Sequence, residues 1–143
     1  MKIIVWVLRF LPLVYMAAIW YMSGQPDNLV IELPDHGVDR FFKESLHLVE
    51  FGILYGLLFL AALTFSGFRP LWSYVFMGVS ILYGLLDEFH QSFVPYRSAT
   101  AIDFVKDVIG VLVFSHFLHH AHFSGKFSRL GRLLDRVDSL ARK

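Results

Sequence analysis

The sequence predicts an all-α membrane protein, a bundle of four transmembrane helices followed by a C-terminal amphipathic helix. Of its 143 residues 56% are hydrophobic and 15 are Phe, more than a small soluble core absorbs. Its mean hydropathy is +0.55. Four continuous apolar runs are each long enough for a helix, and they do not alternate as the strands of a membrane barrel would. Length and pattern together therefore predict one multi-pass (polytopic) helical domain.

The first apolar run extends from Ile3 to Met22 and is interrupted only by Arg9 and Pro12. About 20 residues suffice to cross a hydrocarbon core of ~30 Å. A cleaved signal peptide is the alternative, because a basic residue precedes the run. No small-residue cleavage motif follows, and Trp20 and Tyr21 are typical of an interfacial aromatic belt. We therefore expect a retained helix, with Arg9 extending toward the nearer membrane surface.

The other three runs follow a turn-rich, mostly acidic loop that is expected from Ser23 to Ser45. Gly52 and Gly56, four residues apart, would let a neighbouring helix approach closely, although glycine is also simply tolerated in membrane helices. Thr100, with an acid three residues later, is typical of a helix N-terminal cap. The three runs are Leu46–Phe65, Leu71–Leu86, and Ala101 to His116 or slightly beyond.

The basic residues predict the orientation of these helices in the membrane. Arg69 lies in the short turn after the second run without an acid beside it, and six further basic residues follow the fourth run. The first loop is mostly acidic. Because cytoplasmic segments carry the excess of Lys and Arg, both termini are expected in the cytoplasm. The chain is thus predicted to be a multi-pass protein of the cytoplasmic membrane, with its first and third loops outside.

The segment from residue 123 to 143 is predicted to form a basic cytoplasmic tail, separate from the membrane domain of residues 1–122. Apolar residues recur here at spacings of three or four, with arginines on the opposite face. This pattern favours a helix that lies on the anionic inner leaflet, and a solvated tail is the alternative. The apolar residues are Phe127, Leu130, Leu133, Leu134, Val137 and Leu140.

The predicted topology brings ionisable side chains of three helices to the outer face of the membrane. They lie at the start of the second helix, the end of the third and the start of the fourth. Ionisable residues at this depth are costly and are commonly functional. The set comprises His47, Glu50, Asp87, Glu88, His90, Gln91, Asp103 and Asp107, with Arg97 in the connecting loop.

Buried charges must neutralise one another, and Arg97 is the expected cation because its planar fork can serve two carboxylates. Its candidate partners are Glu88, Asp103 and Asp107. Lys106 points away from Asp107 on a helix and is expected to extend to the outer headgroups. The acids still outnumber the fixed cations, which implies a protonated carboxyl, a charged histidine or a bound cation. An ion network that only locks the helices together is the alternative.

These residues carry a resemblance to the VanZ-like family of small membrane proteins, which is associated with teicoplanin resistance. It spans most of the chain from Ser23 to Gly110. The matching segments are Asp87-Glu88-Phe89-His90-Gln91, then Phe93-Val94-Pro95-x-Arg97, then Asp103, Asp107 and Gly110, and earlier Lys43-x-x-x-His47-x-x-Glu50-Phe51 with Ser23 before it.

Three positions depart from the family pattern. Tyr96 stands where the family commonly has glycine, Asp107 where it often has asparagine, and Phe42 where an aspartate usually precedes the lysine. The tyrosine alters the turn of the loop. The additional acid makes the site more negative, which favours a cation or an extra proton.

The resemblance implies an envelope protein that acts on or binds membrane lipids or a lipid-linked cell-wall precursor. In the catalytic form of this hypothesis, general acid–base work needs carboxyl groups or histidines with displaced pKa values. The catalytic candidates are Glu88, His90, Asp103, Asp107, Glu50 and His47, and the substrate-binding candidates are Arg97, for a phosphate, with Gln91, Lys43 and Ser23. Whether the protein is an enzyme stays open at this point.

Two other functions are compatible with the same residues. A non-catalytic protein could bind or mask the precursor with no proton chemistry. A metal-dependent hydrolase could use the acids and histidines, but no tight ligand motif such as HExxH exists, so no cofactor is expected. Transport is disfavoured because the helix centres are apolar, and nucleotide or nucleic-acid binding lacks a Gly-rich loop or a long basic surface. A homo-oligomer is compatible with the sequence, and the histidines of residues 115–122 are expected at a solvated or headgroup-facing helix end on the cytoplasmic side.

Overall fold

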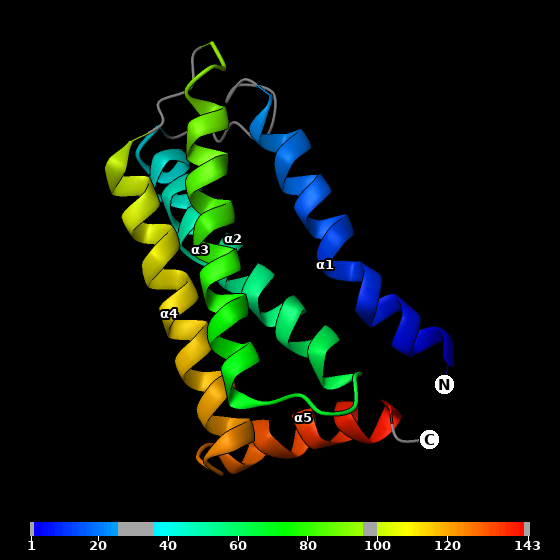
Figure 1. Ribbon diagram of the computed structural model, residues 1–143. Helices are drawn as coiled ribbons and strands as arrows, with labels where there is room; N and C mark the ends of the chain where they lie inside the picture. The colour runs from blue at the N-terminus through cyan, green and yellow to red at the C-terminus, as the bar shows by residue number, and fades with distance from the viewer. Residues whose placement is uncertain (1, 26–35, 96–99, 142–143) are drawn as a thin grey trace.

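A computed structural model describes residues 2–25, 36–95 and 100–141, without the side chains of residues 36–44, 47 and 141. Over these residues the chain is all-α and has no strand, as predicted. It forms five helices, shown in Figure 1: α1 (Lys2–Ser23), α2 (His36–Leu63), α3 (Pro70–Gln91), α4 (Ala101–Phe123) and α5 (Ser128–Ala141).

Helices α2, α3 and α4 pack together, and α1 leans against α2 and α3. Helix α5 crosses one end of this bundle, near the labelled N- and C-termini (Figure 1). We call this end the α5 end. The opposite end, where α1 and α3 finish and α4 begins, is called the loop end.

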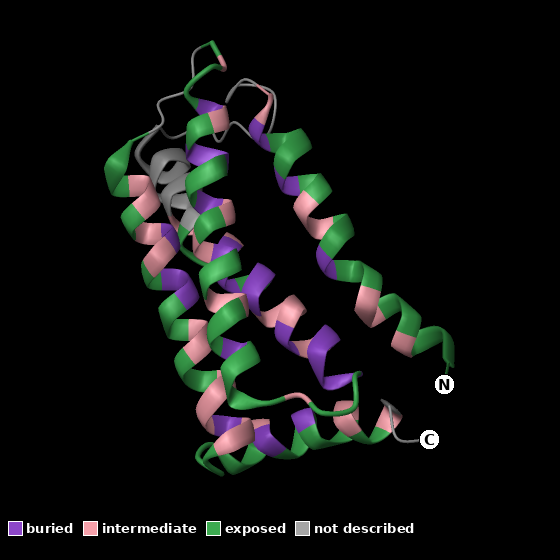
Figure 2. Ribbon diagram, viewed as in Figure 1, coloured by how far each residue is buried: buried purple, intermediate pink, exposed green. Residues whose placement is uncertain are grey.

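Helix α2 is the centre of the core. Five of its large side chains are completely or almost completely buried, and Val111 of α4 joins them. In Figure 2 the buried residues follow the faces that these helices turn toward one another. The buried residues of α2 are Phe51, Leu54, Tyr55, Phe59 and Leu63.

The helix α2 begins at His36, so the prediction of a loop up to Ser45 was wrong over its last ten residues, 36–45. The apolar run from Leu46 marked only the part of the helix that has high hydropathy. Residues Val38, Phe41 and Phe42 continue with helical spacing among charged residues, which is typical of a half-exposed helix. Helix α3 likewise continues through its polar end, and α4 extends to Phe123.

Two of the described helices, α1 and α3, are long and apolar enough to cross a membrane. Residues 48–63 of α2 form a shorter apolar helical segment. Helix α1 also leaves large apolar side chains exposed, among them Ile3, Leu13 and Val14. A soluble protein would have to hydrate this surface, so these helices indicate association with a membrane.

The predicted amphipathic helix of the tail is present as α5, and part of its apolar face packs against the bundle. Leu134 is only 2% exposed, and Leu130 and Val137 pack against the core cluster. A Cβ on Gly131 would lie 3.0 Å from the carbonyl oxygen of Ala121, so α5 lies close against α4. Helix α5 thus covers the ends of α2 and α4, while Phe127 and Leu133 are exposed, and the contact with the inner leaflet stays a prediction.

Arg9 has a partner in the protein that the sequence did not indicate. Its Nε donates to Oγ1 of Thr64 at 2.9 Å and its Nη2 donates to the Thr64 carbonyl at 2.7 Å. The guanidinium carbon lies 4.0 Å from the centroid of the Phe65 ring. The predicted reach of this side chain toward the nearer membrane surface stays a prediction. It caps the C-terminal end of α2, where carbonyl groups have no partner within the helix.

Candidate functional site

The last two turns of α3 bury polar side chains at the loop end. Asp87 is 1% exposed, Glu88 is 7% and Gln91 is 2%. Gln91 lies one turn beyond Asp87 on the same face, and its Nε2 donates to Asp87 Oδ2 at 2.5 Å. Two carboxyl groups and an amide thus occupy space that an apolar bundle would normally fill with aliphatic side chains.

Helix α4 adds Asp107, which is fully buried. A Cβ on Gly84 of α3 would lie 3.4 Å from the Asp107 Cβ and 3.5 Å from Phe51 of α2. Asp107 therefore lies where all three helices meet, and the missing side chain of Gly84 leaves room for it. We call Asp87, Glu88, Gln91 and Asp107 the acid cluster.

Close approach of α2 and α4 near the acid cluster depends on glycine. A Cβ on Gly110 would lie 1.7 Å from the carbonyl oxygen of Leu48, which is far inside van der Waals contact. A Cβ on Gly52 would meet the Phe114 ring at 2.6 Å, so the predicted packing role of Gly52 is confirmed. Gly56 would make only ordinary contacts, the nearest at 3.7 Å.

His90 and Ser23, both predicted site residues, lie together at the end of α1. The Ser23 Oγ and His90 Nδ1 are 3.1 Å apart. The His90 ring also stacks on Trp20, with centroids 4.0 Å apart and an interplanar angle of 9°. These contacts turn His90 toward α1 and fix its ring, so that it borders the acid cluster from that side.

Glu50 is half-buried on α2 and its backbone carbonyl accepts a hydrogen bond from the Tyr15 hydroxyl at 3.2 Å. The Tyr83 hydroxyl donates to the Met16 carbonyl at 2.7 Å. It is also within electrostatic reach of the carboxyl groups of Asp87 and Glu50. Glu50 therefore faces the same region as the acid cluster. Next to this region the Tyr15 hydrogen bond joins α1 to α2, and the Tyr83 hydrogen bond joins α3 to α1.

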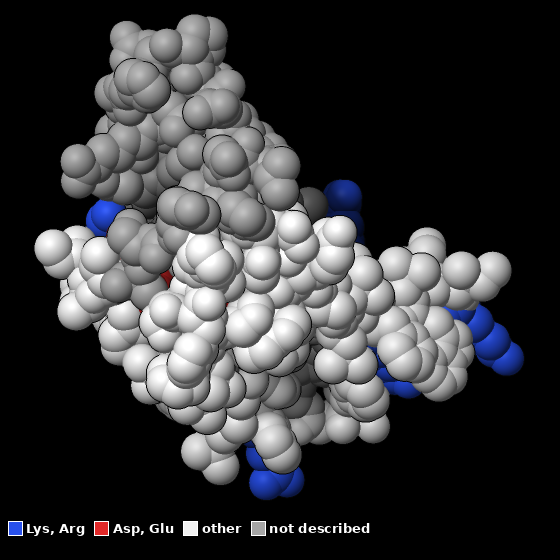
Figure 3. Space-filling model, turned by 90° about the horizontal axis from the view of Figure 1, so that it is seen from above, with Lys and Arg blue, Asp and Glu red and all other residues white. Residues whose placement is uncertain are grey.

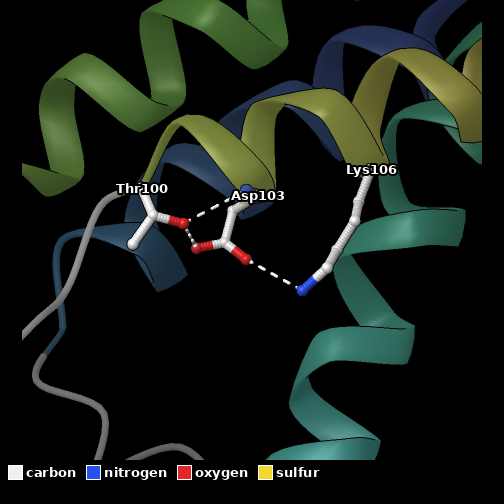
Figure 4. A network of polar contacts seen from close by, with 3 residues as sticks. All are labelled: Thr100, Asp103 and Lys106. Carbon is white, nitrogen blue, oxygen red and sulfur yellow. Dashed lines mark hydrogen bonds and ion pairs between the residues drawn. The ribbon is translucent and has the colours of Figure 1, made fainter.

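Asp103 is engaged in a network at the start of α4, shown in Figure 4. The Asp103 backbone N–H donates to Thr100 Oγ1 at 3.2 Å, which confirms the predicted cap. The Thr100 hydroxyl in turn donates to Asp103 Oδ2 at 2.6 Å, and Lys106 Nζ lies 3.2 Å from Oδ1. Lys106 thus pairs with Asp103 one turn closer to the start of α4, and its predicted reach to the headgroups stays a prediction.

Three predicted site residues fall outside what the structure describes: Arg97, and the side chains of Lys43 and His47. Their roles stay predictions. In the described part of the chain no three histidine, aspartate or glutamate side chains are placed to hold a metal ion. The metal hypothesis likewise stays untested, since His47 belongs to its proposed ligand set.

Some residues around the acid cluster were not singled out from the sequence. Trp20 was assigned to the interfacial aromatic belt, and that assignment gives no information on its stacking with His90. Tyr83 resembled any other aromatic residue in an apolar run. Gly84 could have been found, since it lies one turn before Glu88 and small residues commonly mark close helix contacts.

Viewed from the loop end in Figure 3, acidic side chains occupy very little of the described surface. The carboxyl groups of the acid cluster are instead inside the bundle, where a charge has to be balanced by a cation or by hydrogen-bond donors. Such groups are suited to exchanging protons with a bound molecule or to balancing a cation.

Comparison with known families gives one match. The model of the family described as VanZ/LLP1 matches residues 3–120, which includes every residue of the acid cluster. No curated protein and no solved structure matches the chain.

Proposed function

The chain belongs to the VanZ/LLP1 family, and on this premise we propose that it is a multi-pass protein of the cytoplasmic membrane whose loop end binds the polar headgroup of an envelope lipid or lipid-linked cell-wall precursor. In this proposal α1 to α4 cross the bilayer, the termini are cytoplasmic and the loop end faces outward. The apolar helices α1 and α3 and the basic residues around Arg69 and α5 support this placement.

The observation that carries the proposal is the burial of three carboxyl groups in an otherwise apolar bundle. Asp87, Glu88 and Asp107 are at most 7% exposed. Moving a charged group out of water costs roughly several kcal/mol even after the protein relaxes. One ion pair would be enough to lock helices together, so three buried acids with a buried amide favour a binding or proton-exchange role.

The roles follow from position and chemistry. Arg97, in the loop next to α3 and α4, supplies the cation for a phosphate group, because its fork matches phosphate geometry. Glu88 and Asp107 accept or donate protons and hydrogen bonds toward the headgroup. His90, held by Trp20 and Ser23, borders the site from α1.

Teicoplanin resistance provides a biological readout for this proposal, as the family resemblance implies. In the proposed placement the loop end faces outward, where lipid-linked precursors would present their headgroups. A protein that modifies or masks these headgroups would lower susceptibility.

The central test replaces Glu88 by Gln, which keeps size and hydrogen bonding but removes proton exchange. We expect protection against teicoplanin to be lost while the variant accumulates in the membrane at wild-type level. Asp135→Asn is the matched control, because Asp135 is exposed on α5 and the same change of acid to amide should leave protection intact. Full protection by Glu88→Gln at normal abundance would contradict the proposal.

A second pair of variants separates catalysis from binding. Arg97→Lys keeps the charge but removes the fork, so it should impair protection under either mechanism. Glu88→Asp shortens the carboxyl group by one methylene. Partial protection by both Glu88→Asp and Glu88→Gln would indicate binding alone, whereas complete loss with both indicates general acid–base chemistry.

A further inference from the structure

A second polar site lies at the α5 end, far along the bundle from the acid cluster. A cavity of about 250 Å³ opens there between α3 and α4. Its polar lining contains hydroxyl and imidazole groups and no carboxyl group, while Met77 and Leu112 supply apolar surface. We call it the histidine groove, and its polar residues are Ser73 and Tyr74 of α3 and Ser115, His116, His119 and His120 of α4.

A chain of hydrogen bonds leads from the core into this groove. The Tyr55 hydroxyl of α2 lies 2.7 Å from Ser73 Oγ. The same Oγ lies 3.0 Å from His119 Nδ1. His119 Nε2 in turn lies 3.5 Å from the hydroxyl of Tyr74. Three helices are thereby linked by one polar chain that ends at an exposed tyrosine.

Burial determines the direction of the chain. Tyr55 is completely buried, and a buried hydroxyl whose hydrogen finds no acceptor is costly. We infer that Tyr55 donates to Ser73 and that Ser73 in turn donates to His119 Nδ1. A neutral imidazole has one acceptor and one donor nitrogen, so Nε2–H points to the Tyr74 oxygen. The Tyr74 hydrogen is left over and is available to a ligand in the groove.

Two histidines add further donors. The rings of His116 and His120 have centroids 4.7 Å apart, at a spacing of one helical turn. His120 Nδ1 lies 3.1 Å from Ser124 Oγ, which leaves its Nε2 available to the groove. A ligand of this site must accept hydrogen bonds from Tyr74 and imidazole groups, in the absence of any acid. Phosphate oxygens have this property.

The depth of the groove identifies the source of the phosphate. Ser73 is three residues from the start of α3, and His119 is four residues from the end of α4. At 1.5 Å per residue both lie roughly 5 Å from the helix ends. In the membrane placement proposed above, this is the level of the lipid headgroups on the α5 side.

We propose that the histidine groove binds the phosphate of a phospholipid in the leaflet at the α5 end. Tyr74, His116 and His120 donate to the phosphate oxygens, and Met77 and Leu112 contact the start of an acyl chain. His119 does not touch the ligand, since both of its nitrogens are engaged, and it orients Tyr74. A metal site is less well supported, because no three of the described histidines and acids converge on one point. The inference rests on the proposed membrane placement and not on the chemistry of the loop end.

The test uses the purified, delipidated full-length chain in detergent. Thermal unfolding and lipid retention in native mass spectrometry are measured with phosphatidylglycerol, with diacylglycerol of the same chains, and with inorganic phosphate. We expect only phosphatidylglycerol to be retained and to raise the melting temperature. Tyr74→Phe and His120→Gln should each weaken retention about tenfold, the effect of one hydrogen bond to a charged group.

Two controls make the result specific. Tyr21→Phe removes an exposed hydroxyl at the other end of the molecule and should retain the lipid as the wild type does. Asp135→Asn, which changes an exposed acid of α5 that lines neither site, should do the same. Equal retention of diacylglycerol, or unchanged retention in both groove variants, would overturn the proposal. Stabilisation by inorganic phosphate alone would overturn the lipid assignment, and stabilisation by Zn²⁺ that requires His116 and His120 would replace it by a metal site.

Discussion

The two ends of the bundle solve the problem of polar groups in an apolar protein in opposite ways. At the loop end the acid cluster buries carboxyl groups, and Oδ1 of Asp87 has no hydrogen-bond partner among the described residues. At the α5 end the buried hydroxyl groups of Tyr55, Ser73 and Thr64 are neutral and each has a short hydrogen bond, and only the uncharged Nδ1 of His122 is buried without one among the described residues. The guanidinium group of Arg9, also at this end, donates hydrogen bonds to the hydroxyl and carbonyl oxygens of Thr64.

This difference separates stability from function. Neutral hydrogen-bonded groups contribute modestly to folding and cost little to bury, so the α5 end is suited to holding the helices together. Burying a carboxyl group costs free energy that only well-placed partners offset, so three buried acids are not explained by stability alone. The loop end is therefore where substitutions should affect activity without a matching loss of stability.

The largest effect is expected where α2 and α4 cross between the two ends. In Gly110→Ala the new Cβ would lie 1.7 Å from the Leu48 carbonyl oxygen, and backbone cannot give way as a flexible side chain does. The helices must separate, at a cost of roughly 3 kcal/mol or more. Thermal or denaturant unfolding in detergent measures the loss.

Gly78→Ala is the control for this change, because a Cβ there would have no neighbour within 4 Å. Its stability should be close to that of the wild type. A Gly110→Ala protein as stable as Gly78→Ala would contradict the close contact of α2 and α4 at this point. It would also contradict the geometry described for the acid cluster, which depends on that contact.

The second-largest effect is expected at Asp87 and Gln91, where the buried carboxyl group can be compared with the amide that donates to it. Gln91→Leu removes the amide that donates to Asp87 and should cost about 2 kcal/mol, since the carboxyl group stays buried. Asp87→Asn removes the charge and keeps an acceptor for Gln91, so its stability should equal or exceed that of the wild type. If Asp87→Asn destabilises as strongly as Gln91→Leu, the acid is structural, and the contrast between the ends is lost.

At the α5 end the order of effects should reveal the direction of the hydrogen-bond chain. Ser73→Ala leaves the buried Tyr55 hydroxyl without its acceptor, which costs about 1–3 kcal/mol. Tyr55→Phe should cost less, because Ser73 can still donate to His119. The double variant should be more stable than Ser73→Ala, and a double-mutant cycle of unfolding free energies measures this coupling. Additive effects would contradict the proposed chain.

The smallest effect is expected at the ion pair shown in Figure 4. The side chains of Lys106 and Asp103 are 24% and 17% exposed, so solvent screens part of their attraction. Lys106→Gln should change the unfolding free energy by no more than about 0.5 kcal/mol. Thr100→Ala should cost about 1 kcal/mol, because it removes the helix cap. The reverse order would mean that charge, not capping, holds the start of α4.

The sequence was sufficient for the helical class and for the residues that gather at the loop end. Apolar runs of helical length specify helices directly, and polar residues at matching ends of such runs must lie at one level. Asp87, Glu88, Gln91 and Asp107 were found in this way. The cap at Thr100 is local and was also predictable.

Other features depend on partners distant in the sequence. Nothing near Arg9 indicates that Thr64 will need a cap, and nothing near His90 indicates that Trp20 will stack on it. The start of α2 was missed because a half-exposed helix has weak hydropathy. The apolar face of α5 was recognised, but periodicity cannot distinguish a lipid surface from the ends of neighbouring helices.

The contact between Arg9 and Thr64 has a consequence for synthesis. The ribosome delivers α1 well before α2, so the guanidinium group is in place when the last turn of α2 emerges. The carbonyl of Thr64 can then be satisfied as soon as the helix ends. Because Arg9 is synthesised before Thr64, the hydrogen bonds between them can form as soon as α2 is complete.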